Sequence, residues 1–146
     1  ARGTERRMRG HDLDVELLCE RRGVVAVRKA PGVTTEATLE ALQARYDRLG
    51  LLNRRVISVS RLDRDTSGVL VAATSPAGAE CLTEQFRGRT VSKRYLALCV
   101  GRLEPSAGEV NARLYISGFS EKYRAYVSPK GKEACTRYEV LRHLAV

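Results

Sequence analysis

The sequence predicts an α+β domain built on a mixed, mostly antiparallel sheet with flanking helices. First, segments with the two-residue alternation of strands follow one another along the chain, which favours antiparallel pairing between neighbours. Second, two segments have the longer period of helices, with residues at both ends that start and stop a helix. Third, the chain has 146 residues, 43% of them hydrophobic, which is enough for one domain with a buried core.

The first half of the chain holds four predicted strands and one predicted helix. The strands cover residues 13–19, 23–28, 55–60 and 69–73. The helix runs from Glu36 to Leu49, because its apolar side chains recur on one face. They are Leu39, Leu42, Tyr46 and Leu49. Thr34 or Thr35 can cap the start of this helix, and Gly50 can end it.

The second half holds one more predicted helix and then strands alone. A serine–proline pair starts the helix at Ser75, and Gly88 ends it. Residues 90–100 predict a long strand, whose alternation puts Lys93 and Tyr95 on one side. The remaining predicted strands cover residues 109–115, 122–127 and 133–141.

The charge balance indicates a polyanionic partner. Lys and Arg total 26 against 17 Asp and Glu, so the net charge is +9 and the isoelectric point is about 9.8. Nucleic acid is the commonest polyanion that such a domain binds. Arginine supplies 21 of the 26 cations, and its planar group suits phosphate and base stacking, although a GC-rich genome favours arginine as well. No apolar run approaches the roughly 18 residues of a membrane-spanning helix, so we expect no membrane partner.

The first residues differ from the rest. Residues 1–12 are basic and lack a hydrophobic pattern, so we predict an arm ahead of a domain over residues 13–146. The arm fits a disordered phosphate-binding segment, a processed organellar leader or a cut point in a longer protein.

The cysteines bear on the compartment. They lack the paired spacing of zinc sites, and we expect buried thiols in a reducing environment. They are Cys19, Cys81, Cys99 and Cys135. A basic protein with free thiols suits the mitochondrial or another organelle matrix, with the cytoplasm as the alternative.

The segment that carries chemistry lies between two predicted strands, at residues 60–68, which read SRLDRDTSG. Arg61 and Arg64 flank Asp63, and nearby positive charge favours the ionised form of a carboxylate. An ionised carboxylate at the mouth of a sheet can act as a covalent nucleophile, and Thr66 with the serine and glycine after it can form local backbone bonds. Taken alone, the pattern is also typical of a solvated turn.

Residues 59–70 closely resemble the catalytic motif of the RluA-type pseudouridine synthases, whose pattern is His-Arg-Leu-Asp-x-x-Thr-Ser-Gly-Leu-Leu. Three more segments are similar to family motifs, in the same order and spacing: a strand ending in Lys-Pro-x-Gly, a Lys-x-Tyr strand and an Ala-x-Thr-x-Tyr strand. They lie at residues 17–33, 85–101 and 134–141. The resemblance runs from about residue 15 to the end and implies a pseudouridine-synthase-like fold.

The resemblance implies that the protein isomerises uridine to pseudouridine in ribosomal or transfer RNA without a cofactor or metal. Asp63 would be the nucleophile that forms a covalent adduct with the target nucleotide, and Tyr95 would stack on the flipped uracil. Composition alone makes Tyr95 a half-buried strand aromatic and the lysines solvated edge charges. RNA contacts are implied for Arg61, Arg64, Lys29, Lys93 and Thr66.

The sequence departs from the family pattern at three places. Ser60 replaces the family's histidine, and the proline of the first motif has moved by one position, to Pro31. Family members also continue to a Gly-Arg-Thr-His-Gln-Ile-Arg-like segment, whose arginine pairs with the catalytic aspartate. This chain ends before that segment, so we expect an incomplete fold that covers about the first two-thirds of the catalytic domain.

Three hypotheses for function follow. In the first hypothesis the chain is part of a longer enzyme, which the retention of Asp63 and Tyr95 favours. Alternatively, it is an inactive homologue that serves as an RNA-binding scaffold with ribosomal or assembly-factor proteins, which the missing segment favours. The third hypothesis is a basic nucleic-acid-binding module of unrelated ancestry, which predicts steep salt dependence and no preference for RNA over DNA.

Overall fold

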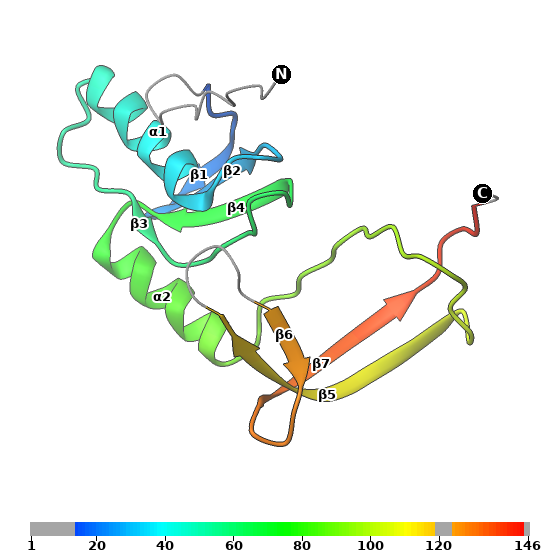
Figure 1. The fold of residues 1–146 in the computed structure, drawn as a ribbon. Coiled ribbons are helices and arrows are strands. Elements are labelled where there is room, and N and C mark those ends of the chain that lie inside the picture. The colour runs from blue at the N-terminus through cyan, green and yellow to red at the C-terminus, as the bar shows by residue number, and fades with distance from the viewer. Residues whose placement is uncertain (1–13, 119–123, 145–146) are drawn as a thin grey trace. The chain divides into compact units, whose positions relative to one another are not determined.

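The computed structural model describes residues 14–118 and 124–144. The chain forms two compact units, Ala1–Lys93 and Arg94–Val146, and each is described by itself. The predicted arm over residues 1–12 lies outside the described residues. Both units contain antiparallel strands, and both helices belong to the first unit (Figure 1).

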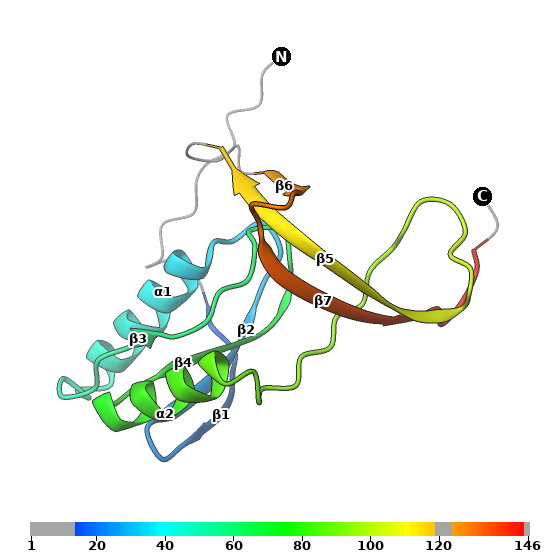
Figure 2. The ribbon, with the colours of Figure 1, turned by 90° about the horizontal axis from the view of Figure 1, so that it is seen from below.

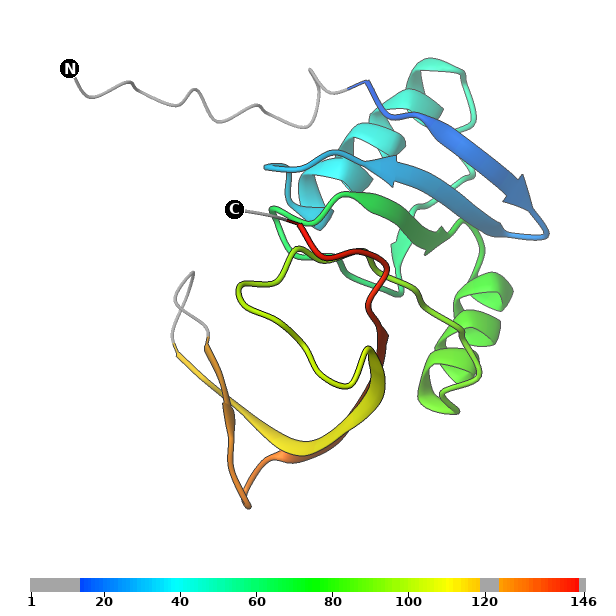
Figure 3. The same cartoon turned by 90° about the vertical axis from the view of Figure 1, so that its right-hand side faces the viewer.

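The first unit holds a four-stranded sheet with the strand order β1-β2-β4-β3. Its strands are β1 (Leu17–Arg21), β2 (Val24–Lys29), β3 (Ile57–Ser58) and β4 (Gly68–Ala73). Every pair of neighbouring strands is antiparallel. Figure 3 shows β1, β2 and β4 side by side. Two predicted strands are displaced or shortened: the strand expected at 13–19 is found at 17–21, and the one expected at 55–60 pairs only over 57–58.

Helix α1 (Thr35–Arg48) covers one face of this sheet and forms the core with it. Of the two predicted caps Thr34 is the one observed, because its hydroxyl accepts a hydrogen bond from the Ala37 N–H at 3.1 Å, and the helix begins one residue before the predicted Glu36. The core residues come from both layers: Val25, Val27, Leu70 and Ala72 from the sheet, and Leu39, Ala41, Leu42 and Tyr46 from the helix. Full burial of one Val or Leu side chain stabilises the folded protein by about 1.5–3 kcal/mol.

Helix α2 (Pro76–Arg87) packs its first turn against the turn between β1 and β2. Ser75 caps it, accepting a hydrogen bond from the Gly78 N–H at 3.1 Å. A side chain at Gly78 would collide with the carbonyl group of Gly23, so the close approach of helix and hairpin requires glycine there. The predicted start and end of this helix, Ser75 and Gly88, are both confirmed.

The second unit is a three-stranded sheet with the order β6-β5-β7. Its strands are β5 (Ala107–Ser117), β6 (Arg124–Val127) and β7 (Lys132–Glu139). Strands β5 and β7 form a long, curved antiparallel pair (Figure 2). Cross-strand partners share a face, so one face carries the ion pair between Glu109 and Arg137 at 2.8 Å. The opposite face carries the apolar side chains of Val110, Leu114, Ile116 and Val127, together with Lys132 and Thr136.

Two predictions are corrected here. Residues 90–100 alternate as a strand would, but no described strand pairs with them, so they form no strand. Alternation gives only the two faces of an extended segment, whereas a strand also needs a neighbour for its backbone groups. The cysteines are unpaired, as expected, but all four are exposed rather than buried. An apolar neighbour in sequence did not place these thiols in the core.

Candidate active site

The loop that carries the predicted nucleophile connects β3 to β4, and its start is fixed to the sheet. The hydroxyl of Ser60 donates a hydrogen bond to the carbonyl oxygen of Val71, in β4, at 2.7 Å. Leu62 is partly buried and packs against the hydrophobic core. The residue that replaces the family's histidine therefore has a structural contact, and Leu62 holds the loop to the core immediately before Asp63.

The backbone of Leu62 is held by a buried side chain of α1. Thr35 Oγ1 accepts a hydrogen bond from the Leu62 N–H at 3.1 Å and donates one to the Leu62 carbonyl oxygen at 2.9 Å. Thr35 is only 2% exposed. One hydroxyl thus satisfies both main-chain groups of the residue before Asp63, which a hydroxyl can do because it both donates and accepts.

The other side of Asp63 is held by Lys29, the last residue of β2. Its ammonium group donates to the carbonyl oxygens of Ala30 at 3.0 Å, Val33 at 2.6 Å and Arg64 at 2.8 Å. The side chain is fully buried. Burial lowers the pKa of Lys29 below its ordinary value, and the charges of Asp65 and Asp63 oppose that effect. Lys29 is thus not a solvated charge at the sheet edge. Its N–H groups are all bonded within the protein, which leaves none available to RNA.

Asp63 is exposed between these two fixed positions. Its carbonyl oxygen accepts a hydrogen bond from the Thr66 N–H at 3.1 Å, which closes a tight turn after the carboxylate. Among residues 14–118 and 124–144, no side chain or N–H group forms a hydrogen bond or salt bridge with the Asp63 carboxylate. The Asp63 carboxylate is therefore accessible to solvent, while hydrogen bonds hold the backbone of the residues before and after it.

Two exposed arginines flank this carboxylate in the sequence. Arg61 forms an ion pair with Glu36, in the first turn of α1, at 3.5 Å, and both side chains are mostly exposed. Arg64 Nε donates to the carbonyl oxygen of Gly32 at 3.2 Å. Both guanidinium groups remain partly accessible, so the loop presents positive charge beside Asp63, as an RNA-binding surface requires.

Tyr95 and Lys93 lie on the segment that forms no strand. Lys93 is the last residue of the first unit, and Tyr95 belongs to the second. Both are exposed, and 64% of the Tyr95 surface is accessible. The implied stacking of Tyr95 on the flipped uracil stays a prediction.

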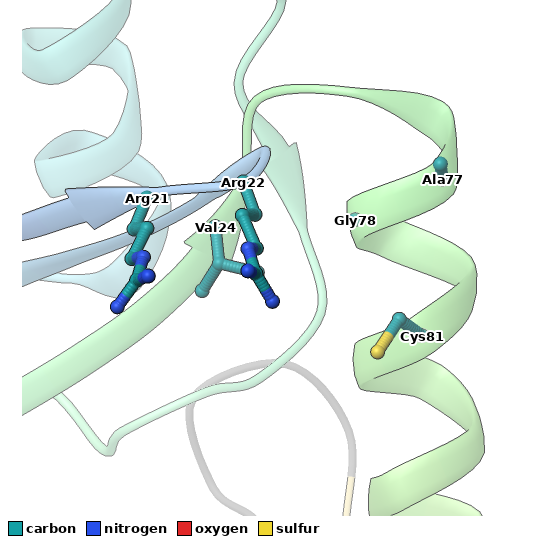
Figure 4. Close-up of a pocket in the computed structure, with 6 residues that line it drawn as sticks. All are labelled: Arg21, Arg22, Val24, Ala77, Gly78 and Cys81. Carbon is teal, nitrogen blue, oxygen red and sulfur yellow. The ribbon is translucent and has the colours of Figure 1, made fainter.

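The first unit also has a shallow hollow of about 360 Å³ that none of the predicted site residues lines. Figure 4 shows Arg21 and Arg22 on the hairpin and Cys81 on α2, all lining this hollow. The hollow adjoins Val24, at the opposite end of β2 from Lys29, so it is separate from the Asp63 loop. Within the described residues there is no cluster of three potential metal ligands and no helix long and apolar enough to span a membrane.

The sequence pattern pointed to the loop but missed part of what holds it. The sequence indicates Thr35 only as a possible helix cap, and nothing local to residue 35 indicates a partner 27 positions away. For Lys29 a signal was present: it continues the alternation of Val25 and Val27, both buried, which places it on the core face of β2.

The chain is similar to known proteins over most of its length. A family model described as RNA pseudouridylate synthase matches residues 21–145. The ribosomal large subunit pseudouridine synthase C of Vibrio parahaemolyticus is 41% identical over 83 residues, which cover 57% of this chain and 26% of that protein. The dual-specificity RNA pseudouridine synthase RluA of Haemophilus ducreyi is 39% identical over 88 residues, 58% of this chain and 40% of that protein.

A solved structure extends the likeness to the fold. The human protein RNA pseudouridylate synthase domain containing 4 superimposes with a TM-score of 0.67 at 26% identity, over 86% of this chain and 53% of that one. The predicted α+β fold class is thereby confirmed. The aligned parts span only between a quarter and about half of the length of these three proteins.

Proposed function

Because the chain belongs to the RNA pseudouridylate synthase family, to which the RluA-type motifs had assigned it, we propose that the protein isomerises uridine to pseudouridine in RNA with Asp63 as nucleophile. The observation that carries this proposal is the exposed Asp63 carboxylate, which forms no hydrogen bond or salt bridge with the described residues and sits between two fixed residues. A nucleophile must be accessible, and its neighbours must hold it in one geometry.

The reaction is an isomerisation, so its atoms balance without a co-reactant. The Asp63 carboxylate forms a covalent bond to the target nucleotide as the bond between uracil N1 and ribose C1′ breaks. The uracil then turns, C5 bonds to C1′, the Asp63 bond is released, and C5 loses a proton while N1 gains one. The target has to leave the base stack for these atoms to be reached, and the exposed ring of Tyr95 is suited to stack on the flipped base.

RNA contacts fall to residues on and beside the loop, which are exposed except for the half-buried Thr66. Arg61, Arg64 and Thr66 belong to the nucleophile loop, and Lys93 is exposed at the end of the first unit. The net charge of +9 supports binding to a phosphate backbone. Lys29 acts instead by fixing the backbone, because its three N–H groups are all used within the protein. Whether the substrate is ribosomal or transfer RNA stays a prediction, as do protein partners and an organelle location.

The test compares two carboxylates of the same loop. Asp65 is exposed like Asp63 and lies two residues away, so Asp65→Asn makes the same charge change without touching the proposed nucleophile. Total RNA from cells lacking the gene is incubated with each full-length variant, and pseudouridine is mapped chemically. We expect new pseudouridine with the wild type and with Asp65→Asn, and none with Asp63→Asn.

The same experiment separates the enzyme from the scaffold. Identical pseudouridine maps with Asp63→Asn and wild type would exclude Asp63 as nucleophile. A wild-type protein that binds ribosomal particles or RNA tightly, forms no pseudouridine and binds equally well as Asp63→Asn would support the scaffold. Binding of DNA as tightly as RNA would favour a general nucleic-acid module.

A further inference from the structure

We propose that Thr35 is a positioning residue for the nucleophile: its buried hydroxyl fixes the Leu62 backbone and thereby sets where Asp63 projects. The inference deepens the proposed function and rests on it. Thr35 lies outside the motif loop, on the first turn of α1, 28 positions before Asp63.

The contact itself is strong for a neutral side chain. Thr35 Oγ1 both accepts from the Leu62 N–H, at 3.1 Å, and donates to the Leu62 carbonyl oxygen, at 2.9 Å. Leu62 lies between β3 and β4 and has no strand partner among the described residues. The hydroxyl therefore takes the place of a sheet partner for this residue, and it does so from a buried position where water does not compete.

Hydrogen bonds within the helix also fix the position of Thr35. Thr34 caps the helix by accepting from the Ala37 N–H, and the Thr34 carbonyl oxygen accepts from the Thr38 N–H at 3.1 Å. The start of α1 is thus a rigid reference, and Thr35 transfers its position to Leu62. With the Arg64 carbonyl held by Lys29 at 2.8 Å, both neighbours of Asp63 are anchored while its carboxylate stays accessible.

Thr38 provides a matched control on the same helix. It is 3% exposed against 2% for Thr35, and its hydroxyl also donates to a backbone carbonyl, that of Thr34 at 3.0 Å. Its bond, however, stays within α1. Thr35→Val and Thr38→Val both remove a buried hydroxyl while keeping side-chain shape, but only Thr35→Val releases the loop. Thr35→Ser keeps the hydroxyl.

The experiment measures single-turnover pseudouridine formation by the full-length variants at saturating protein, on RNA from cells lacking the gene, together with RNA affinity and thermal unfolding. At temperatures where all variants are folded, we expect Thr35→Val to slow the reaction about 10- to 100-fold, as a nucleophile displaced by around 1 Å does. RNA affinity should stay within about twofold, Thr35→Ser should restore most of the rate, and Thr38→Val should leave the rate within about twofold.

The possible failures are distinguishable. If the wild type is active and Thr35→Val slows the reaction no more than Thr38→Val, or Thr35→Ser fails to restore the rate, then Thr35 does not position the nucleophile. If the wild type itself forms no pseudouridine, the proposed function is overturned, and the catalytic role of Thr35 with it. Hydrogen exchange of the Leu62 amide tests the contact directly. Unchanged protection of this amide in Thr35→Val would overturn the proposed role of the hydroxyl, whatever the activity.

Discussion

Both compact units of this chain contain an antiparallel sheet, but they differ in how much apolar surface the sheet buries. In the first, a helix covers one face of a four-stranded sheet, and its interior holds the buried hydrophobic residues of the described chain. In the second, the described residues form three paired strands and no helix, and Gly131 is the one buried residue among them. Pairing satisfies the backbone of both sheets, but only the first sheet gains from burying apolar side chains.

This difference in burial determines which unit can hold a loop in one conformation. In the first unit, the buried side chains of Thr35 and Lys29 hold the loop around Asp63 by hydrogen bonds to its backbone. In the second, polar contacts such as the Glu109–Arg137 pair are exposed, and exposed ion pairs stabilise little. A sheet with an uncovered face is marginal by itself. The loop that carries the proposed nucleophile belongs to the unit with a core.

The largest expected effect comes from the core. Leu70, in β4, is fully buried, whereas Leu96, in the second unit, is 87% exposed. Leu70→Ala should lower the free energy of unfolding by about 2–5 kcal/mol through lost burial and a residual cavity. Leu96→Ala should change it by less than about 0.5 kcal/mol. Urea unfolding of the full-length variants measures both, and equal losses would break the comparison by showing Leu96 to be buried in the full-length protein.

The next effect concerns the buried ammonium. Lys29→Met leaves the carbonyl oxygens of Ala30, Val33 and Arg64 without this donor, and should destabilise the protein by about 1–3 kcal/mol. The exposed Lys93 supplies the control, since Lys93→Met removes the same charge at the surface. Similar unfolding midpoints for the two variants would mean that the Lys29 contacts contribute little.

The stabilising contribution of Lys29 should also depend on pH. Because burial lowers its pKa below 10.5 in the folded protein, the unfolded chain binds more protons between the folded pKa and 10.5, and stability rises with pH across that window. The stability difference between wild type and Lys29→Met should therefore grow as pH is raised from 7 towards 10.5. A difference that shrinks with pH would show that the charged form is favoured by folding.

The smallest effect is expected at the exposed pair of the second unit. The hydrogen bond from Arg137, followed by that from Asn111, lowers the pKa of Glu109 below 4.5. This stabilising contribution is present above pH 4.5 and is lost as pH falls through the folded pKa. Glu109→Gln should therefore lose part of the acid dependence of the urea midpoint between pH 3 and 6, while Glu139→Gln, the same change elsewhere in the sheet, should keep it. Equal curves for all three proteins would show that the pair contributes nothing.

The order of the helices and most strands could be predicted from the sequence because their signals are local. Thr34 and Ser75 cap helices through bonds three residues away, and alternation is a property of neighbouring residues. The segment at 90–100 carries the same alternation yet forms no strand, because strand formation depends on a partner that neighbouring residues do not specify. The exposure of the four cysteines could not be predicted for the same reason, because burial depends on what packs over a residue.

The sequence by itself determined the family and the loop that carries Asp63, because the spacing of the motif residues is a one-dimensional property. The tertiary structure decided how that loop is held. Thr35 and Leu62 lie 27 positions apart, and Lys29 and Arg64 lie 35 apart; only packing of α1 on the sheet brings them within hydrogen-bond distance. Whether a polar side chain contacts solvent or a distant backbone depends on what covers it, and that is fixed by the packing of elements rather than by adjacent residues.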